Sequence, residues 1–175
     1  MEKYPIYWPQ FFTATILEWK QLLSQDKYKT VINDGLRYLT INKKIALYAF
    51  VIMRNHLHLI WQVLPDSDIE SIQAGILKFT ARQMRLDLIT HQPLVLEKFK
   101  VDAKDREYQF WERNSLGIDL YPNDVLMQKL EYVHWNPVKA GLCNFPEEYY
   151  YSSAKFYHTG IDVPIAIGIK ILTHC

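Results

Sequence analysis

Two histidines two positions apart, His56 and His58, are the residues of this chain best suited to metal chemistry. On a β-strand, side chains at this spacing share one face, with Cα atoms about 7 Å apart, so both imidazoles can reach one ion. Neutral imidazole is a common ligand of divalent metals. The other positions of the strand are apolar and would face a core: Leu57, Leu59, Trp61 and Val63. The pattern predicts a metal site, or else two histidines that only pack or form hydrogen bonds.

A second pair, Tyr132 and Asn136, lies one helical turn apart, so both side chains can point to one spot. The Asn136 oxygen could be a third metal ligand, and Tyr132 could attack a phosphodiester. A phenol is almost wholly protonated at neutral pH, so such a nucleophile needs a metal that polarises the phosphate. Attack would give a phosphotyrosine that conserves the bond energy for rejoining. Alternatively, Tyr132 is a packing residue beside an apolar helix face.

The composition indicates one soluble, intracellular domain over residues 1–175. With 49% hydrophobic residues, the chain can form one sizeable core but is short for two domains. Its 20 basic and 19 acidic residues nearly cancel, so any polyanion must meet a local patch. The cysteines, Cys143 and Cys175, lack ligand spacing and indicate a reducing compartment. No stretch approaches about 18 continuous apolar residues, so we expect a cytoplasmic protein with no membrane partner.

Apolar periodicity predicts the elements that position these residues. Residues 11–17 form a strand pattern, residues 26–39 a helix pattern, and residues 45–53 a strand buried on both faces. A short joint leads into the histidine strand, so these two strands should form an antiparallel hairpin. A long helix is predicted over residues 69–88.

The second half is less regular, and residues 108–112 give its best strand pattern. A helix then begins near residue 123 and presents Leu126, Leu130 and Val133 to the sheet. Pro137 should end or kink this helix at Asn136. The order strand, helix, strand, strand, helix, strand, helix predicts an α+β fold, a ferredoxin-like split βαβ sandwich with helices packed on an antiparallel sheet.

Basic residues on the long helix offer a local patch for a polyanion. Lys78, Arg82 and Arg85 are spaced i, i+4, i+7, which fits a solvated face or contact with phosphates. Four further positions complete the predicted contacts to a DNA backbone: Lys98, Lys100, Lys104 and Arg106. Such binding would be sensitive to salt.

Two segments carry a family resemblance. Residues 53–60 read Met-Arg-Asn-His-Leu-His-Leu-Ile, and residues 128–142 read Gln-Lys-Leu-Glu-Tyr-Val-His-Trp-Asn-Pro-Val-Lys-Ala-Gly-Leu. Together they resemble the REP-associated branch of the single-tyrosine HUH transposases, and the match extends into residues 145–149 and 152–154. The resemblance implies these site residues: His56 and His58 as metal ligands, Asn136 as the third ligand, and Tyr132 as the nucleophile.

The same resemblance implies an HUH endonuclease type of fold, Mg or Mn as cofactor, and a nucleoid-associated location in the cytoplasm. It implies cleavage of single-stranded DNA beside a hairpin, as in REP-like elements, leaving a 5′-phosphotyrosine and a free 3′ hydroxyl. Related enzymes use the tyrosine helix in one chain or exchange it across a dimer, so monomer and homodimer both stay open. The near-neutral charge departs from what a DNA-processing enzyme often shows.

Other residues and functions compete with this interpretation. His134 should be structural because it points away from Tyr132 on the helix. Glu131 and Glu112 could be extra ligands, although surface exposure is the better default, and the tyrosines at 149–151 could be rival nucleophiles. Two other functions remain open: a domesticated hairpin-binding protein without activity, and a metal-dependent nuclease that uses water.

Overall fold

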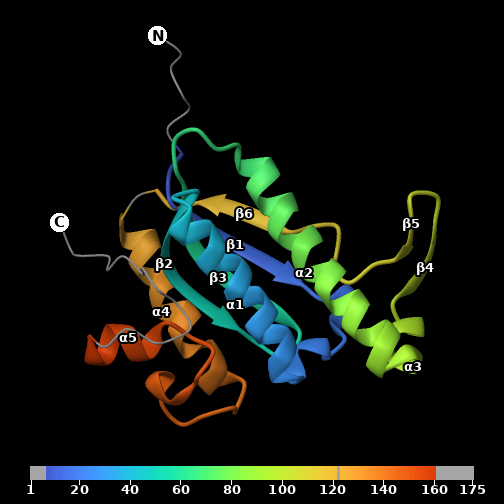
Figure 1. The fold of residues 1–175 in the computed structure, drawn as a ribbon. Helices are drawn as coiled ribbons and strands as arrows, with labels where there is room; N and C mark the ends of the chain where they lie inside the picture. Colours follow the sequence, from blue (N-terminus) through green and yellow to red (C-terminus); the bar gives the residue numbers. More distant parts are fainter. Residues whose placement is uncertain (1–6, 122, 161–175) are drawn as a thin grey trace.

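A four-stranded antiparallel sheet lies at the centre of the computed structural model, which describes residues 7–121 and 123–160 (Figure 1). Its strands follow the order β2-β3-β1-β6, so β3 lies between β1 and β2. This arrangement confirms the predicted α+β, split βαβ sandwich. The strands are β1 Gln10–Thr15, β2 Ile45–Ile52, β3 His56–Val63 and β6 Leu116–Asp119. The long helices are α1 Asp26–Ile41, α2 Ile69–His91 and α4 Asn123–Lys139.

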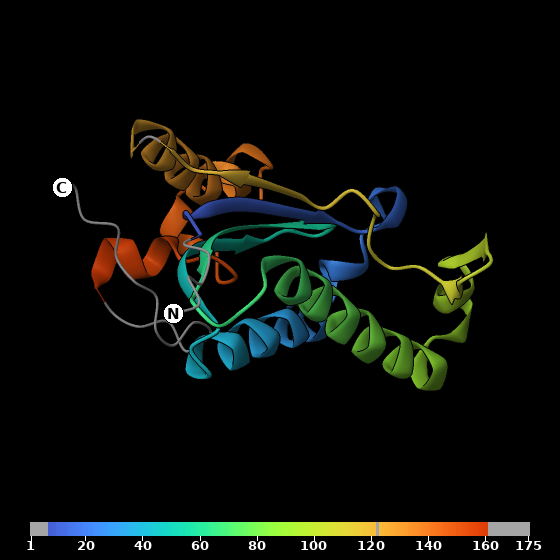
Figure 2. The same ribbon diagram turned by 90° about the horizontal axis from the view of Figure 1, so that it is seen from above.

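Helices cover both faces of the sheet, as Figure 2 shows, with α1 and α2 on one face and α4 on the other. The buried side chains form two clusters, one on each side. The odd-numbered residues of β3, predicted to face a core, all lie in the cluster under α1 and α2: Leu57, Leu59, Trp61 and Val63. The even-numbered side chains, including both histidines, therefore face α4.

A register shift in β2 explains its continuous apolar sequence. The pairing with β3 skips one residue between Leu47 and Ala49, as in a β-bulge. Leu47 and Phe50 consequently belong to the cluster under α1 and α2, whereas Ala49 and Val51 belong to the cluster under α4. Both faces of the strand are buried, as predicted.

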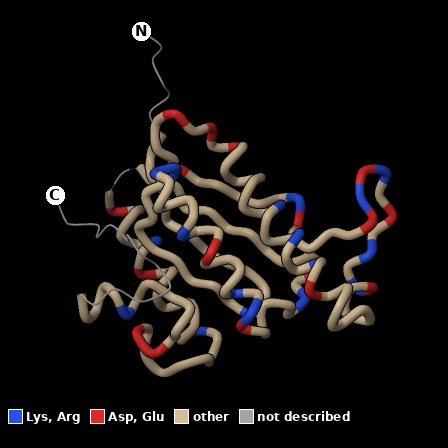
Figure 3. The backbone as a smooth tube through the Cα atoms, in the orientation of Figure 1, with Lys and Arg blue, Asp and Glu red and all other residues tan. Residues whose placement is uncertain are grey.

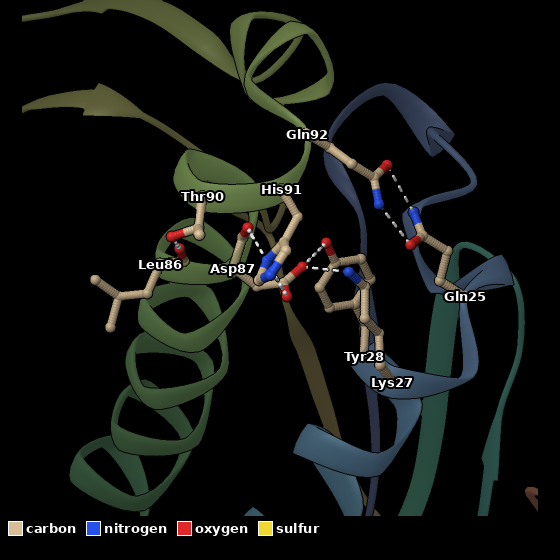
Figure 4. Close-up of polar contacts among 8 residues, drawn as sticks. All are labelled: Gln25, Lys27, Tyr28, Leu86, Asp87, Thr90, His91 and Gln92. Atoms are coloured by element: carbon tan, nitrogen blue, oxygen red, sulfur yellow. Dashed lines mark hydrogen bonds and ion pairs between the residues drawn. The ribbon is translucent and has the colours of Figure 1, made fainter.

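Polar contacts join the start of α1 to the end of α2 (Figure 4). The Tyr28 hydroxyl donates to Asp87 over 2.7 Å, and Lys27 also donates to this carboxylate. Gln25 and Gln92 exchange two hydrogen bonds of 2.9 and 3.3 Å. Burial, the bond to Asp87 and its charge raise the pKa of Tyr28, so the phenol stays a donor. These contacts fix the helix pair beneath the sheet.

The predicted strand over residues 108–112 is wrong. The fourth sheet strand is β6, whose four residues are all exposed, while β5 Arg106–Tyr108 pairs with β4 Lys100–Ala103 in a separate hairpin. This hairpin projects beyond the sheet near the short helix α3 Pro93–Glu97 (Figures 1 and 2). Phe110 and Trp111 are 3% and 6% exposed and belong to the core. Trp111 forms a single antiparallel bridge with Ile16 beyond the end of β1, which is too short to be a strand.

Helix α4 continues to Lys139 with Pro137 inside it, so the helix does not end at Asn136, which was one of the two outcomes predicted for this position. The proline falls in the last turn, where its missing N–H removes one helical bond, and its ring is buried.

The segment after α4 returns to the free edge of β2, where the backbones of Tyr151 and Ser153 form hydrogen bonds with those of Ile52 and Phe50. It contains η3 Pro146–Glu148 and α5 Ala154–Thr159; η1 Leu17–Trp19 and η2 Leu22–Ser24 precede α1. Within the described ranges, every helix is too short or too polar to cross a bilayer.

Candidate active site

His56 and His58 converge on the face of the sheet that α4 covers. Their ring centroids are 4.8 Å apart with an edge-to-face orientation. Strand β3 is held on both sides, since His58 pairs with Thr13 of β1 and with Val51 of β2. A central strand leaves little freedom to the backbone that carries these imidazoles. The predicted convergence is therefore present, while the ligand role stays a prediction.

His58 is held as a neutral base. It is 5% exposed, its ring stacks on Phe11 at 5.1 Å, and its Nδ1 forms a 2.8 Å hydrogen bond with the Thr13 hydroxyl. Burial, together with the positive charges of His56 and Lys129, lowers the pKa of His58 to about 3. If Nδ1 donates to Thr13, the lone pair of Nε2 is free for a ligand.

His56 is arranged in a similar way and brings Asn136 into the site. Its Nδ1 lies 2.7 Å from the Asn55 carboxamide oxygen, which accepts a hydrogen bond. Burial lowers the pKa of His56, and a hydrogen bond with the Asn136 side chain partly offsets this effect. The carboxamide of Asn136 thus reaches the histidine pair from α4. The three predicted ligands lie together.

Helix α4 also brings Tyr132 to the histidines. Leu126, Leu130 and Val133 are buried against the sheet, as predicted, and this packing turns the adjacent face of the helix toward β3. The Tyr132 ring lies 5.3 Å from His58 and 5.9 Å from Phe11 between centroids. It is 38% exposed, so a polymer can reach the phenol from solvent.

Two lysines stand over Tyr132. The Nζ of Lys129 lies 5.4 Å from the centre of the tyrosine ring and 4.7 Å from that of Phe11. Lys139 lies further along α4, and its Nζ is 5.8 Å from the centre of the tyrosine ring. Both cations border a hollow of about 460 Å³ that Tyr132 also lines. The site is therefore electropositive near the phenol, which suits a phosphate.

The remaining candidates lie elsewhere or serve the structure. His134 forms a 2.9 Å bond with the Ser153 hydroxyl, and burial lowers its pKa to about 4, which fits the predicted structural role. Glu112 accepts from the Glu18 backbone, and Tyr149 donates to the Ile52 carbonyl. Among the described residues, no group of three or more His, Cys, Asp or Glu side chains could hold a metal. The role of the Asn136 amide as a third ligand stays a prediction.

Sequence reasoning missed Thr13, Phe11 and Trp19. Thr13 and Thr15 are polar residues on the same side of β1 as Phe11, where they pair with His58 and His56, and this polar pattern could have indicated a site. The ring centroids of Trp19 and His56 are 5.9 Å apart in an edge-to-face orientation. No pattern in the sequence around Trp19 predicts this contact.

The structure brings some of the residues predicted to contact DNA together and leaves the others apart. Lys78, Arg82, Arg85 and Arg106 line one hollow between α2 and the β4–β5 hairpin. The other three are exposed outside this hollow: Lys98, Lys100 and Lys104. Acidic residues alternate with basic ones along the hairpin (Figure 3), and Arg85 lies 3.9 Å from Glu107. The structure shows a mixed surface here.

Comparison with solved structures identifies the architecture. A REP-associated tyrosine transposase bound to a REP hairpin superposes with a TM-score of 0.66, covering 99% of this chain and 98% of that one at 15% identity. This chain has the fold of that transposase. The resemblance seen in the two sequence segments is thus confirmed at the level of the fold.

A second solved structure matches a smaller part of the chain. It is a candidate transposase from Deinococcus radiodurans, with a TM-score of 0.50 and 16% identity, covering 77% of this chain and 98% of that one. No protein-family model and no curated protein sequence matches the chain.

Proposed function

We propose that this protein is a metal-dependent transposase of the REP-associated, single-tyrosine HUH type, which cleaves and rejoins single-stranded DNA beside a hairpin. The observation that carries the proposal is the row of rings in the candidate active site. His56, His58 and Tyr132 follow one another at 4.8 and 5.3 Å although they come from two distant segments. The shared fold supports the proposal by analogy only, because one fold can host many functions.

The residues fit a divalent metal such as Mg or Mn. His56 and His58 both have a lowered pKa, so each imidazole is neutral and able to coordinate. Each Nδ1 is engaged by a side chain, Asn55 or Thr13, in the way that fixes the ring of a metal-binding histidine. Asn136 would supply an oxygen. A bound ion would polarise the scissile phosphate and stabilise the leaving 3′ oxygen.

The chain's own residues would carry the covalent step. The Tyr132 hydroxyl oxygen attacks phosphorus and forms a phosphotyrosine, while the bond from phosphorus to the 3′ oxygen breaks. The phenolic proton is lost, and the 3′ oxygen gains a proton to become a hydroxyl. Lys129 and Lys139 place positive charge around the phosphate. The reverse attack by a 3′ hydroxyl rejoins a strand without a nucleotide cofactor.

The DNA partner is proposed from the neighbour and from the charged surface. The structural neighbour is bound to a REP hairpin, and a hairpin stem here could contact Lys78 and Arg82 of α2, for which the described residues show no ion pair within 4.0 Å. Phosphate contacts of this kind give affinity without sequence specificity.

The test is an adduct assay with a labelled, hairpin-bearing single strand and Mn²⁺. Wild type should leave a protein–DNA adduct that survives denaturation, and Tyr132→Phe and His58→Ala should leave none. Tyr150→Phe, which removes a hydroxyl from another exposed tyrosine, should match wild type. Cleavage that persists in Tyr132→Phe but fails in His56→Ala would instead identify a nuclease that uses water. Binding without any cleavage would identify a hairpin-binding protein.

A further inference from the structure

Two exposed tryptophans flank the row of rings in the candidate active site. Trp19 and Trp135 are 62% and 40% exposed. The rings of Trp19, His56, His58 and Tyr132 follow one another with centroid separations of 5.9, 4.8 and 5.3 Å. Trp135 lines the same hollow as Tyr132. One indole therefore stands beside the metal-binding end of the site and the other beside the phenol.

The backbone holds Trp19 exposed at a conformational cost. Glu18 and Trp19 have φ values of 53° and 56°, in the left-handed region that residues with a Cβ avoid. Three hydrogen bonds fasten this turn: the amides of Glu18 and Trp19 donate to Glu112 and Ile16, and Asn55 donates to the Trp19 carbonyl. Because the Trp19 indole is largely exposed, its burial contributes little stability that could offset this backbone cost. Strain of this kind is typical of ligand sites.

Trp135 stands between two hollows of different charge. The hollow of about 460 Å³ on the Tyr132 side contains Lys129 and Lys139, with Glu131 as its one carboxylate. The hollow on the other side, about 670 Å³, has Glu131 and Glu147 among its lining residues and neither lysine nor arginine. A polyanion would therefore occupy the side of the indole that faces Tyr132.

We propose that Trp19 and Trp135 are stacking platforms for unpaired nucleobases on the two sides of the scissile phosphate. Lys129 and Lys139 contact the backbone of the same strand. Exposed aromatic rings beside basic residues bind single strands with little regard to sequence, because every base offers a π-face. Bases inside a duplex have both faces covered, so the platforms select an unpaired strand. The inference rests on the proposed function and deepens it by naming how the strand is held.

The test measures binding in a chelator, so that no cleavage occurs. Fluorescence anisotropy compares a short oligothymidylate with an abasic strand of equal length. Trp19→Ala and Trp135→Ala should each weaken oligothymidylate binding roughly tenfold and leave abasic binding unchanged. Trp19→Phe and Trp135→Phe should retain most of the affinity, since a phenyl ring still stacks. Trp8→Ala is the matched control, because Trp8 is 54% exposed and packs on Tyr121 instead.

Three results would overturn the platforms: no preference of wild type for bases over abasic strand, unchanged affinity in both alanine variants, or an equal loss on the two strands. The readout does not depend on the chemistry of Tyr132. A wild-type adduct together with unchanged binding in the tryptophan variants would refute the platforms alone. Base-dependent binding without any adduct would refute the strand-transfer function alone.

Discussion

Acid should destabilise this protein partly through His134, which α4 buries against the chain leading to α5. Burial lowers the pKa of His134 to about 4 from an ordinary value near 6.5. A depressed pKa means that the unfolded chain binds the proton more readily than the folded one. The stability that the neutral, buried His134 contributes is therefore complete above about pH 6.5 and is lost as the pH falls toward about 4. At about pH 5 the loss is about 2 kcal/mol, from 1.36 kcal/mol per pKa unit.

The substitution His134→Gln removes this titration and keeps a polar partner for Ser153, which lies 2.9 Å from the imidazole. The free energy of unfolding is measured by urea denaturation at about pH 7.5 and pH 5, in a chelator. Wild type should lose about 2 kcal/mol more than the variant between the two conditions. His158→Gln, at a largely exposed histidine, should behave as wild type. An equal pH effect in wild type and His134→Gln would refute the reasoning.

Two further predictions concern the metal and the DNA. Thr13→Val removes the partner of the His58 Nδ1 and should weaken Mn²⁺ binding by about 10-fold to 100-fold in calorimetry. Thr30→Val, at an exposed threonine of α1, should leave Mn²⁺ binding unchanged. Equal affinities of wild type and Thr13→Val would contradict the proposed role. Replacing both Lys78 and Arg82 with Gln should reduce the slope of log affinity for a hairpin strand against log salt by roughly one to two. An unchanged salt dependence would show that Lys78 and Arg82 do not contact the DNA backbone.

The elements with strong periodicity could be predicted from the sequence. The alternation in β3 placed His56 and His58 on one face and its apolar residues on the other, and both assignments agree with the structure. The helix carrying Tyr132 was placed by Leu126 and Leu130 at a spacing that only one helix face satisfies. Where burial requires a repeat, the repeat is visible in the sequence.

The elements that lack such a requirement could not be predicted. The residues of β6 are all exposed at a sheet edge, so no buried face imposes alternation on them. Phe110 and Trp111 are buried in a segment with a single β-bridge, from Trp111 to Ile16, and their apolar side chains gave the sequence a strand pattern. The bulge in β2 is hidden because both faces of that strand are apolar. The contact of Trp19 with His56 depends on tertiary packing that no local pattern records.

The most direct test of the proposed chemistry is to map the covalent bond. After reaction with a hairpin-bearing strand and Mn²⁺, trypsin cleavage at Lys129 and Lys139 releases the peptide 130–139, in which Tyr132 is the sole tyrosine. Mass spectrometry should find this peptide carrying a nucleotide on the Tyr132 oxygen. A nucleotide on the peptide that contains residues 149–151, or cleaved DNA with a free 5′ phosphate and no modified peptide, would contradict the account.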